Sequence, residues 1–315
     1  MTPLFFAGMH GLGDCLHQRA ILRQLLQRHS IVLETSWPSM YHDLVPLGLR
    51  FARKGSGLRT QTKNSLREAS KFTSIRFAQG MRQLRVAYGG SQVLETPSKT
   101  ILEVMCNVTG TSFAEADYRL PVPDAWTSRL FEILGPLPAK ASEKPWLVYR
   151  PLVGRHEWRG SVQRNADPAT YAAIFNEISP QFFTISVADL EPGKEWLVGP
   201  ETKPDLTFHS GELEFEALAA LFKRADLVMT SSGFAAILAP AVETPCLSIV
   251  GGYEDPRCHD SGAKFAPYLA IGPRLPCSCW TSKCRQVCDK TMDIEAALPR
   301  VREFLARCIK VGRQP

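Results

Sequence analysis

Short apolar runs alternate with amphipathic segments along this chain, and this alternation constrains the fold more than any other feature. An apolar run at 3–7 is followed by the tight loop Gly11-Leu-Gly-Asp14, an amphipathic segment at 15–29 and a second apolar run at 31–35. A strand, a helix and another strand in this order form a βαβ unit, whose strands lie parallel in one sheet. The pattern therefore predicts an α/β fold with parallel sheets.

The same alternation restarts in the second half of the chain, after a segment rich in proline, alanine and charge near residue 140. Strands are expected at 146–150, 182–187, 226–230 and 246–250, and helices at 168–178, 213–222, 231–241 and 294–309. We therefore predict two Rossmann-like, doubly wound domains, at 1–140 and 141–315. Ligands of such sheets bind beyond the carboxyl ends of the strands, so a central cleft between the two domains is expected.

The length and composition agree with two globular cores and exclude a small disulfide-stapled module. The chain has 315 residues, of which 44% are hydrophobic and 22% charged. No apolar run approaches the roughly 20 residues that span a bilayer. The first residues lack the basic segment and long apolar core of a secretory signal, so we expect a cytoplasmic protein without a transmembrane segment.

Positive charge is concentrated in the N-terminal half. Residues 1–144 carry 18 basic and 11 acidic side chains, and the remaining residues carry 19 and 20, so the net charge of +6 belongs to the first half. Ten basic residues stand against the single acid Glu68, namely Arg50, Arg53, Lys54, Arg59, Lys63, Arg67, Lys71, Arg76, Arg82 and Arg85. Apolar residues lie among them at roughly helical spacing: Phe72, Ile75, Phe77, Met81 and Leu84. The stretch is typical of a surface that binds a polyanion, and the alternative is a solvated basic helix face without a partner.

The nine cysteines fall into two groups. Five are scattered, mostly in apolar contexts where a thiol acts as a small hydrophobe: Cys15, Cys106, Cys246, Cys258 and Cys308. The other four form C-x-C-x4-C-x3-C within twelve residues: Cys277, Cys279, Cys284 and Cys288. This spacing favours a structural zinc or iron site in a reducing compartment, with reduced free cysteines or disulfides as the alternatives.

Two loops carry residue types suited to chemistry. The first delivers Asp14 at the start of a helix, where its carboxylate can accept a proton from a hydroxyl group, although an ordinary helix cap uses the same residue type. The second is Ser231-Ser232-Gly233, where a strand turns directly into a helix. Its free N–H groups and the helix dipole suit a phosphate, although a serine N-cap is the alternative. Four arginines crowd the loop after the strand at 146–150 and could assist a diphosphate: Arg150, Arg155, Arg159 and Arg164.

Together these segments resemble a known family. The matching residues are Gly11–Asp14 before a helix, the stretch 164–171, Ala225 to Gly233 with the alanine-rich segment after it, and Val250 to Pro256. In this order they look like the ADP-heptose:lipopolysaccharide heptosyltransferases, glycosyltransferase family 9, which have the GT-B fold. The cysteine cluster and the last helix also fall where that family has a cysteine-containing tail.

The resemblance implies an inverting glycosyltransferase that needs no metal or other cofactor for catalysis. The donor would be an ADP-, UDP- or GDP-linked sugar, and the acceptor an anionic glycolipid such as lipopolysaccharide core, reached peripherally at the inner membrane. Asp14 matches the catalytic base. Implied donor-phosphate residues are Arg164, Ser231, Ser232 and Gly233, and implied nucleotide residues are Thr184, Ser186 and Glu216, with Glu214 as an alternative to Glu216. The basic domain supplies the expected acceptor residues Gly13, Arg53, Lys54, Arg59 and Lys63.

The sequence also departs from the family at the phosphate turn. The family commonly has Asp-Thr-Gly there, with a histidine three residues later, whereas this chain has Ser231-Ser232-Gly233 and Ala236. The acidic residue is associated with the heptose hydroxyls, so a hexose or pentose is an alternative donor sugar. Two further alternatives are a glycosyltransferase that modifies hydroxylated DNA bases and a non-catalytic nucleic-acid-binding protein with a cysteine metal knuckle.

Overall fold

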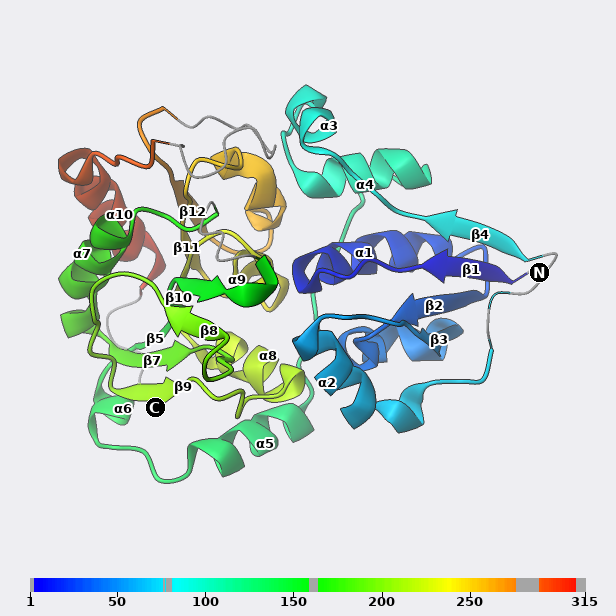
Figure 1. Cartoon of the computed structure of the whole chain (residues 1–315), viewed down its shortest axis with the longest axis horizontal. Helices are drawn as coiled ribbons and strands as arrows, with labels where there is room; N and C mark the ends of the chain where they lie inside the picture. The colour runs from blue at the N-terminus through cyan, green and yellow to red at the C-terminus, as the bar shows by residue number, and fades with distance from the viewer. Residues whose placement is uncertain (1–2, 76, 78–80, 159–163, 276–288, 310–315) are drawn as a thin grey trace. The chain divides into compact units, whose positions relative to one another are not determined.

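The computed structural model describes residues 3–75, 77, 81–158, 164–275 and 289–309 (Figure 1). The chain divides into two compact units, unit 1 at Met1–Pro121 and unit 2 at Val122–Pro315. Both units are α/β, as predicted. Within the described residues, no helix combines the length and apolar character that crossing a membrane requires.

Unit 1 contains one small sheet. Its strands are β1 (Leu4–Ala7), β2 (Ile31–Thr35), β3 (Leu49–Arg53) and β4 (Arg82–Arg85). Its helices are α1 (Leu12–Leu25), α2 (Arg59–Arg67), α3 (Gly90–Glu95) and α4 (Ile101–Thr109), with the 3₁₀ segments η1 (Pro38–Leu47) and η2 (Ala69–Lys71). All neighbouring strands are parallel, in the order β3-β2-β1-β4.

The strand order of unit 1 decides what covers each face of its sheet. Strands β1, β2 and β3 follow one another outward, with α1 and η1 as their connections, and α4 packs on α1. Strand β4 pairs with β1 on the opposite side, so the connection from β3 to β4 must traverse the sheet. The described part of this connection places Ile75 and Met81 on a buried cluster of Phe5, Val32 and Ala52.

This connection differs from the sequence interpretation. The apolar residues between 72 and 84 have helical spacing, but the described residues from 72 to 81 contain no helix, and Leu84 belongs to β4. Their apolar side chains are explained by contact with the sheet, as for Ile75 and for Phe77, whose ring lies 5.5 Å from that of Phe5. An extended segment that crosses a sheet can produce the same spacing as an amphipathic helix.

Unit 2 contains a larger sheet and a short antiparallel pair. Its strands are β5 (Trp146–Tyr149), β6 (Val153–Arg155), β7 (Phe183–Val187), β8 (Glu195–Leu197), β9 (Leu206–Phe208), β10 (Leu227–Thr230), β11 (Cys246–Ile249) and β12 (Tyr268–Ile271). Its helices are α5 (Asp124–Leu134), α6 (Lys140–Glu143), α7 (Pro168–Ile178), α8 (Phe215–Arg224), α9 (Phe234–Ala241) and α10 (Ile294–Cys308). The 3₁₀ segments are η3 (His156–Trp158), η4 (Ser179–Gln181) and η5 (Pro256–Gly262).

The six parallel strands of unit 2 lie in the order β12-β11-β10-β5-β7-β9, and β6 pairs with β8. Helices α7 and α10 share one buried cluster with this sheet, while α8 and α9 contact β5, β10 and β11 and lie on the other side (Figure 1). The doubly wound arrangement predicted for the second half is therefore confirmed. Every strand and helix expected there is present, with bounds that differ by at most three residues.

The division between the units lies before the expected boundary at residue 140. Helix α5 belongs to unit 2, because it packs on α8 of that unit. Trp126 meets Phe215 with ring centroids 6.0 Å apart, and the Arg129 guanidinium donates to the Glu214 carboxylate at 2.9 Å. The proline- and alanine-rich segment near residue 140 thus lies within unit 2 and contains the short helix α6.

Candidate functional site

Each sheet has one place where its crossover connections reverse direction. In unit 2, β7 and β9 follow β5 on one side and β10, β11 and β12 follow on the other, so the reversal lies between β5 and β10. In unit 1 the reversal lies between β1 and β4. Open α/β sheets bind ligands beyond the carboxyl ends of the strands at this switch point. The topology therefore marks one candidate site in each unit.

In unit 1, the switch point holds Asp14. The loop after β1 leads into α1, and Asp14 lies half-buried in the first helical turn. Tyr88, three residues beyond β4, donates its hydroxyl hydrogen bond to Asp14 Oδ1 at 2.9 Å. Strands β1 and β4 thus bring together a carboxylate and a hydroxyl that are 74 positions apart in the sequence. Sequence reasoning identified Asp14 and missed Tyr88, which no local motif marks.

Two glycines fix the loop that carries Asp14. A Cβ at Gly11 would lie 2.4 Å from Asp14 Oδ2, and a Cβ at Gly8 would lie 2.3 Å from the Glu34 carbonyl oxygen. Gly8 N–H also donates to that oxygen at 3.2 Å. Gly11 is the N-cap of α1, so Asp14 is not the cap residue that the alternative interpretation required. Its carboxylate lies in the first turn, where the positive end of the helix favours an anion.

In unit 2, the switch point holds the turn from β10 into α9. Gly233 is the N-cap of α9, with φ +134° and ψ −163°, a conformation that is essentially restricted to glycine. The first N–H groups of the helix therefore follow directly on the end of β10. Arg150, immediately after β5, places its guanidinium 4.5 Å from the centroid of the Phe234 ring in the first turn. A helix N-terminus beside an arginine is well suited to an anion.

The segment 164–165 packs against this turn and against the chain just beyond β11. Ser231 donates its hydroxyl hydrogen bond to the Arg164 carbonyl oxygen at 3.3 Å. A Cβ at Gly251, just beyond β11, would lie 2.1 Å from the Asn165 carbonyl oxygen. The close approach requires glycine at Gly251 and brings the segment 164–165 to the carboxyl ends of β10 and β11. The structure therefore brings Arg164 to the turn Ser231-Ser232-Gly233, which begins 67 positions later in the sequence.

Arg164 is held by a buried carboxylate. Its guanidinium donates to Glu254, whose side chain is only 1% exposed, whereas the Arg164 side chain is 48% exposed. His259 Nε2 lies 3.3 Å from the other oxygen of the Glu254 carboxylate. Burial alone would raise the pKa of Glu254, but the charge of Arg164 and the hydrogen bond with His259 hold it at about 2. Glu254 belongs to the Val250–Pro256 motif, yet its partnership with Arg164 had no signal in the sequence.

The same region contains the one group of described residues with the spacing of metal ligands. Ligand atoms of Glu254, Cys258 and His259 lie within 4.8 Å of one another, and all three residues are buried. Burial and the negative Glu254 raise the pKa of the Cys258 thiol well above its usual range. A metal on the oxygen that faces Cys258 and His259 would have to remove the Cys258 proton and would lie close to the positive Arg164 guanidinium, so these residues fit an ion pair better than a metal centre. The predicted ligands Cys277, Cys279, Cys284 and Cys288 lie outside the described residues.

Three of the residues expected to bind the nucleotide contact neighbouring side chains of unit 2. Thr184 is buried in β7, and its hydroxyl donates to Asp205 at 2.9 Å. The Ser186 hydroxyl lies 2.8 Å from His209 Nε2, nearer the carboxyl end of β7. Glu216 is half-buried in the first turn of α8, and Glu214 pairs with Arg129. Their binding of a nucleotide stays a prediction.

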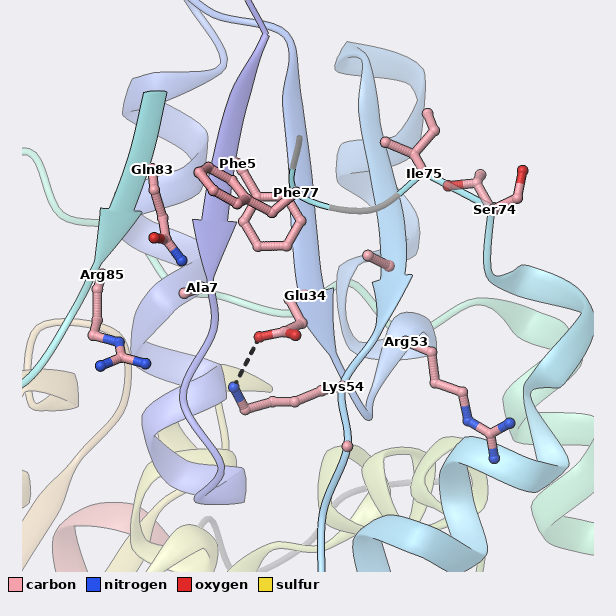
Figure 2. Close-up of a pocket in the computed structure, with 13 residues that line it drawn as sticks. Phe5, Ala7, Glu34, Arg53, Lys54, Ser74, Ile75, Phe77, Gln83 and Arg85 are labelled. Carbon is pink, nitrogen blue, oxygen red and sulfur yellow. Dashed lines mark hydrogen bonds and ion pairs between the residues drawn. The ribbon is translucent and has the colours of Figure 1, made fainter. Parts of the chain in front are cut away.

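Only some of the expected acceptor residues line a cavity. A pocket of about 680 Å³ opens in unit 1, and Arg53 and Lys54 are among its lining residues (Figure 2). Arg59 and Lys63 lie on α2, outside the lining, and Gly13 is buried in α1. Glu68, the single acid of the basic stretch, is buried and accepts hydrogen bonds from Ser39 and Asn64. The sequence predicted the positive charge of this region but gave no sign of the pocket.

The fold and the two switch points together define a class, proteins built from Rossmann-like parallel sheets with ligand-binding carboxyl edges. No protein-family model matches the sequence, and no curated protein matches it either. Solved structures do match over nearly the whole chain.

Several of these structures have TM-scores above 0.5. The ADP-heptose lipopolysaccharide heptosyltransferase II of Escherichia coli has a TM-score of 0.58 at 11% identity, covering 97% of this chain and 99% of its own. A family 9 glycosyltransferase of Veillonella parvula has 0.59 at 12%, covering 97% of both chains. The dodecameric iron-containing glycosyltransferase TibC of enterotoxigenic E. coli has 0.58 at 12%, covering 98% of this chain and 76% of its own. The chain therefore has the GT-B fold of family 9 glycosyltransferases, as its sequence resemblance predicted. None of these names supports the DNA-modifying alternative.

Proposed function

We propose that this protein is a glycosyltransferase that moves a sugar from a nucleotide-sugar donor to a hydroxyl group of an anionic acceptor. The observation that carries the proposal is the switch point of unit 2. There the Arg150 guanidinium lies over the Phe234 ring at the N-terminus of α9, and the backbone of Arg164 packs on the turn whose conformation requires Gly233. This arrangement suits the diphosphate of a nucleotide sugar, and the fold is that of enzymes named as glycosyltransferases.

The donor residues have separate tasks in this proposal. The diphosphate accepts hydrogen bonds from the first N–H groups of α9, beginning beyond Ser232 and Gly233. Arg164, half-exposed and held from behind by Glu254, contacts the phosphates and stabilises the charge that develops as the nucleoside diphosphate leaves. These cations are fixed before the donor binds, so little reorganisation accompanies the reaction.

Asp14 is the proposed base. Its carboxylate removes the proton from the acceptor hydroxyl while that oxygen attacks the anomeric carbon. The bond from the anomeric carbon to the diphosphate oxygen breaks, and the configuration at that carbon inverts. Tyr88 donates a hydrogen bond to Asp14 Oδ1 and so orients the carboxylate, and we therefore assign it a positioning role. No metal takes part in these steps, because arginine and helix N–H groups carry the charge of the leaving group.

The four-cysteine cluster is proposed as a structural site for iron or zinc, separate from the reaction. Its support is the sulfur-rich spacing and the fold shared with an iron-containing glycosyltransferase. Metal analysis of the purified chain tests it. We expect a stoichiometric metal that is lost in Cys277→Ser and Cys288→Ser, and a metal content that these changes leave unaltered would refute it.

The main experiment screens nucleotide sugars against the purified protein. A donor that binds only the folded state raises the melting temperature, by an amount that follows its affinity and concentration. We expect ADP-, UDP- or GDP-linked sugars to stabilise the wild type, and Arg164→Gln to reduce the stabilisation. Stabilising donors are then tested for transfer to acidic saccharides. If no nucleotide sugar among the common ADP, UDP and GDP types stabilises the protein, the proposed function is wrong.

A further inference from the structure

The pocket of unit 1 lies on the face of the sheet that the crossing connection covers only in part. Its walls come from all four strands, from residues 54–55 just after β3 and from residues 73–75 and 77, and none of its described lining residues belongs to a helix. Register explains the hollow: Ala7 lies beside Glu34, and Glu34 lies beside Ala52, so small side chains occupy the centre of the face. Its volume of about 680 Å³ is within the usual range for sites that bind small molecules.

One end of the pocket is lined with cations. Lys54 is only 11% exposed, and its ammonium group pairs with Glu34 at 3.1 Å, which leaves two of its three donor hydrogens for a ligand. Arg85 extends from β4 to the same end, on the other side of Ala7, whereas Arg53 points away from it (Figure 2). Within the described residues, the Arg85 guanidinium has no hydrogen-bond or ion-pair partner. The Arg85 guanidinium and the Lys54 ammonium group, which has two further donor hydrogens, lie at one end of the pocket and are suited to a phosphate or carboxylate.

The rest of the pocket offers a different chemistry. Phe5 and Phe77 form an edge-to-face pair, and Figure 2 shows their rings together at the other end. Gln83, Thr73 and Ser74 add an amide and two hydroxyls around the apolar floor. A lone phosphate would leave most of this volume empty. The lining fits a molecule with one anionic group, several hydroxyls and an apolar ring face, the chemistry of an acidic sugar.

We propose that this pocket is a binding site for a phosphorylated or carboxylated sugar, with Lys54 and Arg85 holding its anionic group. The choice of a saccharide rests on the proposed function, whereas the anion site does not. Two sources share this chemistry, namely a free sugar phosphate and a charged residue of the acceptor itself. The second is sterically reasonable, because Arg85 is three residues before Tyr88, at most about 11 Å along the chain from the partner of Asp14.

The test uses the full chain and three probes: glucose 6-phosphate, glucose and inorganic phosphate. Binding is measured by calorimetry in the wild type, Arg85→Gln, Ala52→Leu and Arg82→Gln. Arg85→Gln removes the anion contact, and Ala52→Leu fills the floor. Arg82→Gln is the matched control, because it removes the same charge from the same strand on the opposite face. Thermal unfolding verifies that each variant is folded.

We expect the wild type to bind glucose 6-phosphate more tightly than either glucose or phosphate. Loss of a charge-assisted contact weakens binding by about tenfold or more, so we expect this loss in Arg85→Gln and no loss in Arg82→Gln. Ala52→Leu should weaken the binding of glucose 6-phosphate more than the binding of inorganic phosphate. The proposal is overturned if glucose 6-phosphate binds no more tightly than glucose. It is also overturned if Arg82→Gln and Arg85→Gln weaken the binding of glucose 6-phosphate equally.

A transfer assay separates the two sources. If the site holds the acceptor, Ala52→Leu raises KM for a charged acceptor and leaves kcat unchanged. If the site holds a free sugar phosphate, KM does not change and the direct binding result stands. Failure of the proposed function has a different signature, since no nucleotide sugar would then bind while glucose 6-phosphate binding would still depend on Arg85.

Discussion

The two units place opposite chemistry at the same topological position. The switch point of unit 1 presents a carboxylate, Asp14, fixed by Tyr88. The switch point of unit 2 presents Arg150, Arg164 and the N-terminus of a helix around Gly233. In both sheets the strands position the functional residues, which lie just beyond the carboxyl ends of the strands. The topology therefore determines where a ligand binds, and the few residues after each strand determine whether the site accepts a proton or binds an anion.

The surface charge separates the units in a different way. Unit 1 carries 15 basic and 8 acidic residues, and unit 2 carries 22 and 23. Several basic residues of unit 1 lie on α2 and around the pocket. In unit 2, basic and acidic residues nearly balance, but Arg150 and Arg164 both belong to segments that contact the turn at the switch point. Clustering at the switch point thus distinguishes the proposed donor site from a generally basic surface.

The largest expected effect is on the carboxylate of unit 1. Asp14→Asn keeps the shape of the side chain but cannot accept a proton, and general base catalysis commonly contributes about 10²–10⁴-fold. We expect kcat to fall by that factor while donor binding, measured by thermal stabilisation, stays at the wild-type level. If transfer were unchanged, Asp14 would not be the base, and the proposed contrast between a proton-accepting site in unit 1 and an anion-binding site in unit 2 would be wrong.

The second expected effect concerns the buried carboxylate of unit 2. The pKa of Glu254 is lowered from 4.5 to about 2, so its stabilisation is present above about pH 4.5 and is lost as the pH falls toward 2. The shift corresponds to about 3 kcal/mol of unfolding free energy. In urea unfolding between pH 6 and 2, we expect Glu254→Gln to show a weaker pH dependence than the wild type.

The control for this experiment is Glu177→Gln, which removes an exposed carboxylate of the same unit that pairs with Arg302. It should retain the wild-type pH dependence. If Glu254→Gln and the wild type lose stability in parallel on acidification, the ion pair with Arg164 does not have the role assigned to it.

The third prediction breaks the turn of unit 2. Gly233 has a backbone conformation that costs other residues about 1–3 kcal/mol, although a Cβ there would meet no atom within 4 Å. Gly233→Ala should therefore weaken donor binding by about tenfold or more through backbone geometry alone. Gly57→Ala in unit 1, also in open space but without a positive φ, should leave donor binding unchanged. Equal donor affinities in the two variants would argue against a phosphate seat at this turn.

The smallest expected effect comes from Tyr88→Phe. The change removes one hydrogen bond to a carboxylate, worth about 1.5 kcal/mol or roughly tenfold in rate. A donated hydrogen bond favours the charged carboxylate, so its loss should also move the acid limb of kcat/KM to higher pH. A fall in rate with an unshifted pH profile would indicate that Tyr88 only packs in the site.

The sequence predicted the strands and helices well, but it predicted poorly the connection that crosses the sheet of unit 1 and the boundary between the units. Periodicity located every strand and helix predicted for unit 2, because each buries one side against the same sheet. It misjudged the segment from 72 to 84, where an extended chain lies on the sheet with helical spacing. It also put the boundary near residue 140, because a proline-rich composition marks any exposed loop. The contact of Trp126 with Phe215, which assigns α5 to unit 2, is a long-range contact that composition cannot reveal.

The sequence by itself determined the alternation of strands and helices, the two loops that carry Asp14 and Gly233, and the basic character of the first half. These properties are local, because they depend on side-chain periodicity and on residues next to one another. Only the tertiary structure decided which partners meet: Tyr88 with Asp14, Glu254 with Arg164, and Lys54 with Arg85 around one pocket. Parallel strands bring distant segments to a common edge, and the order of the strands, which is a property of the whole sheet, selects the segments that become neighbours.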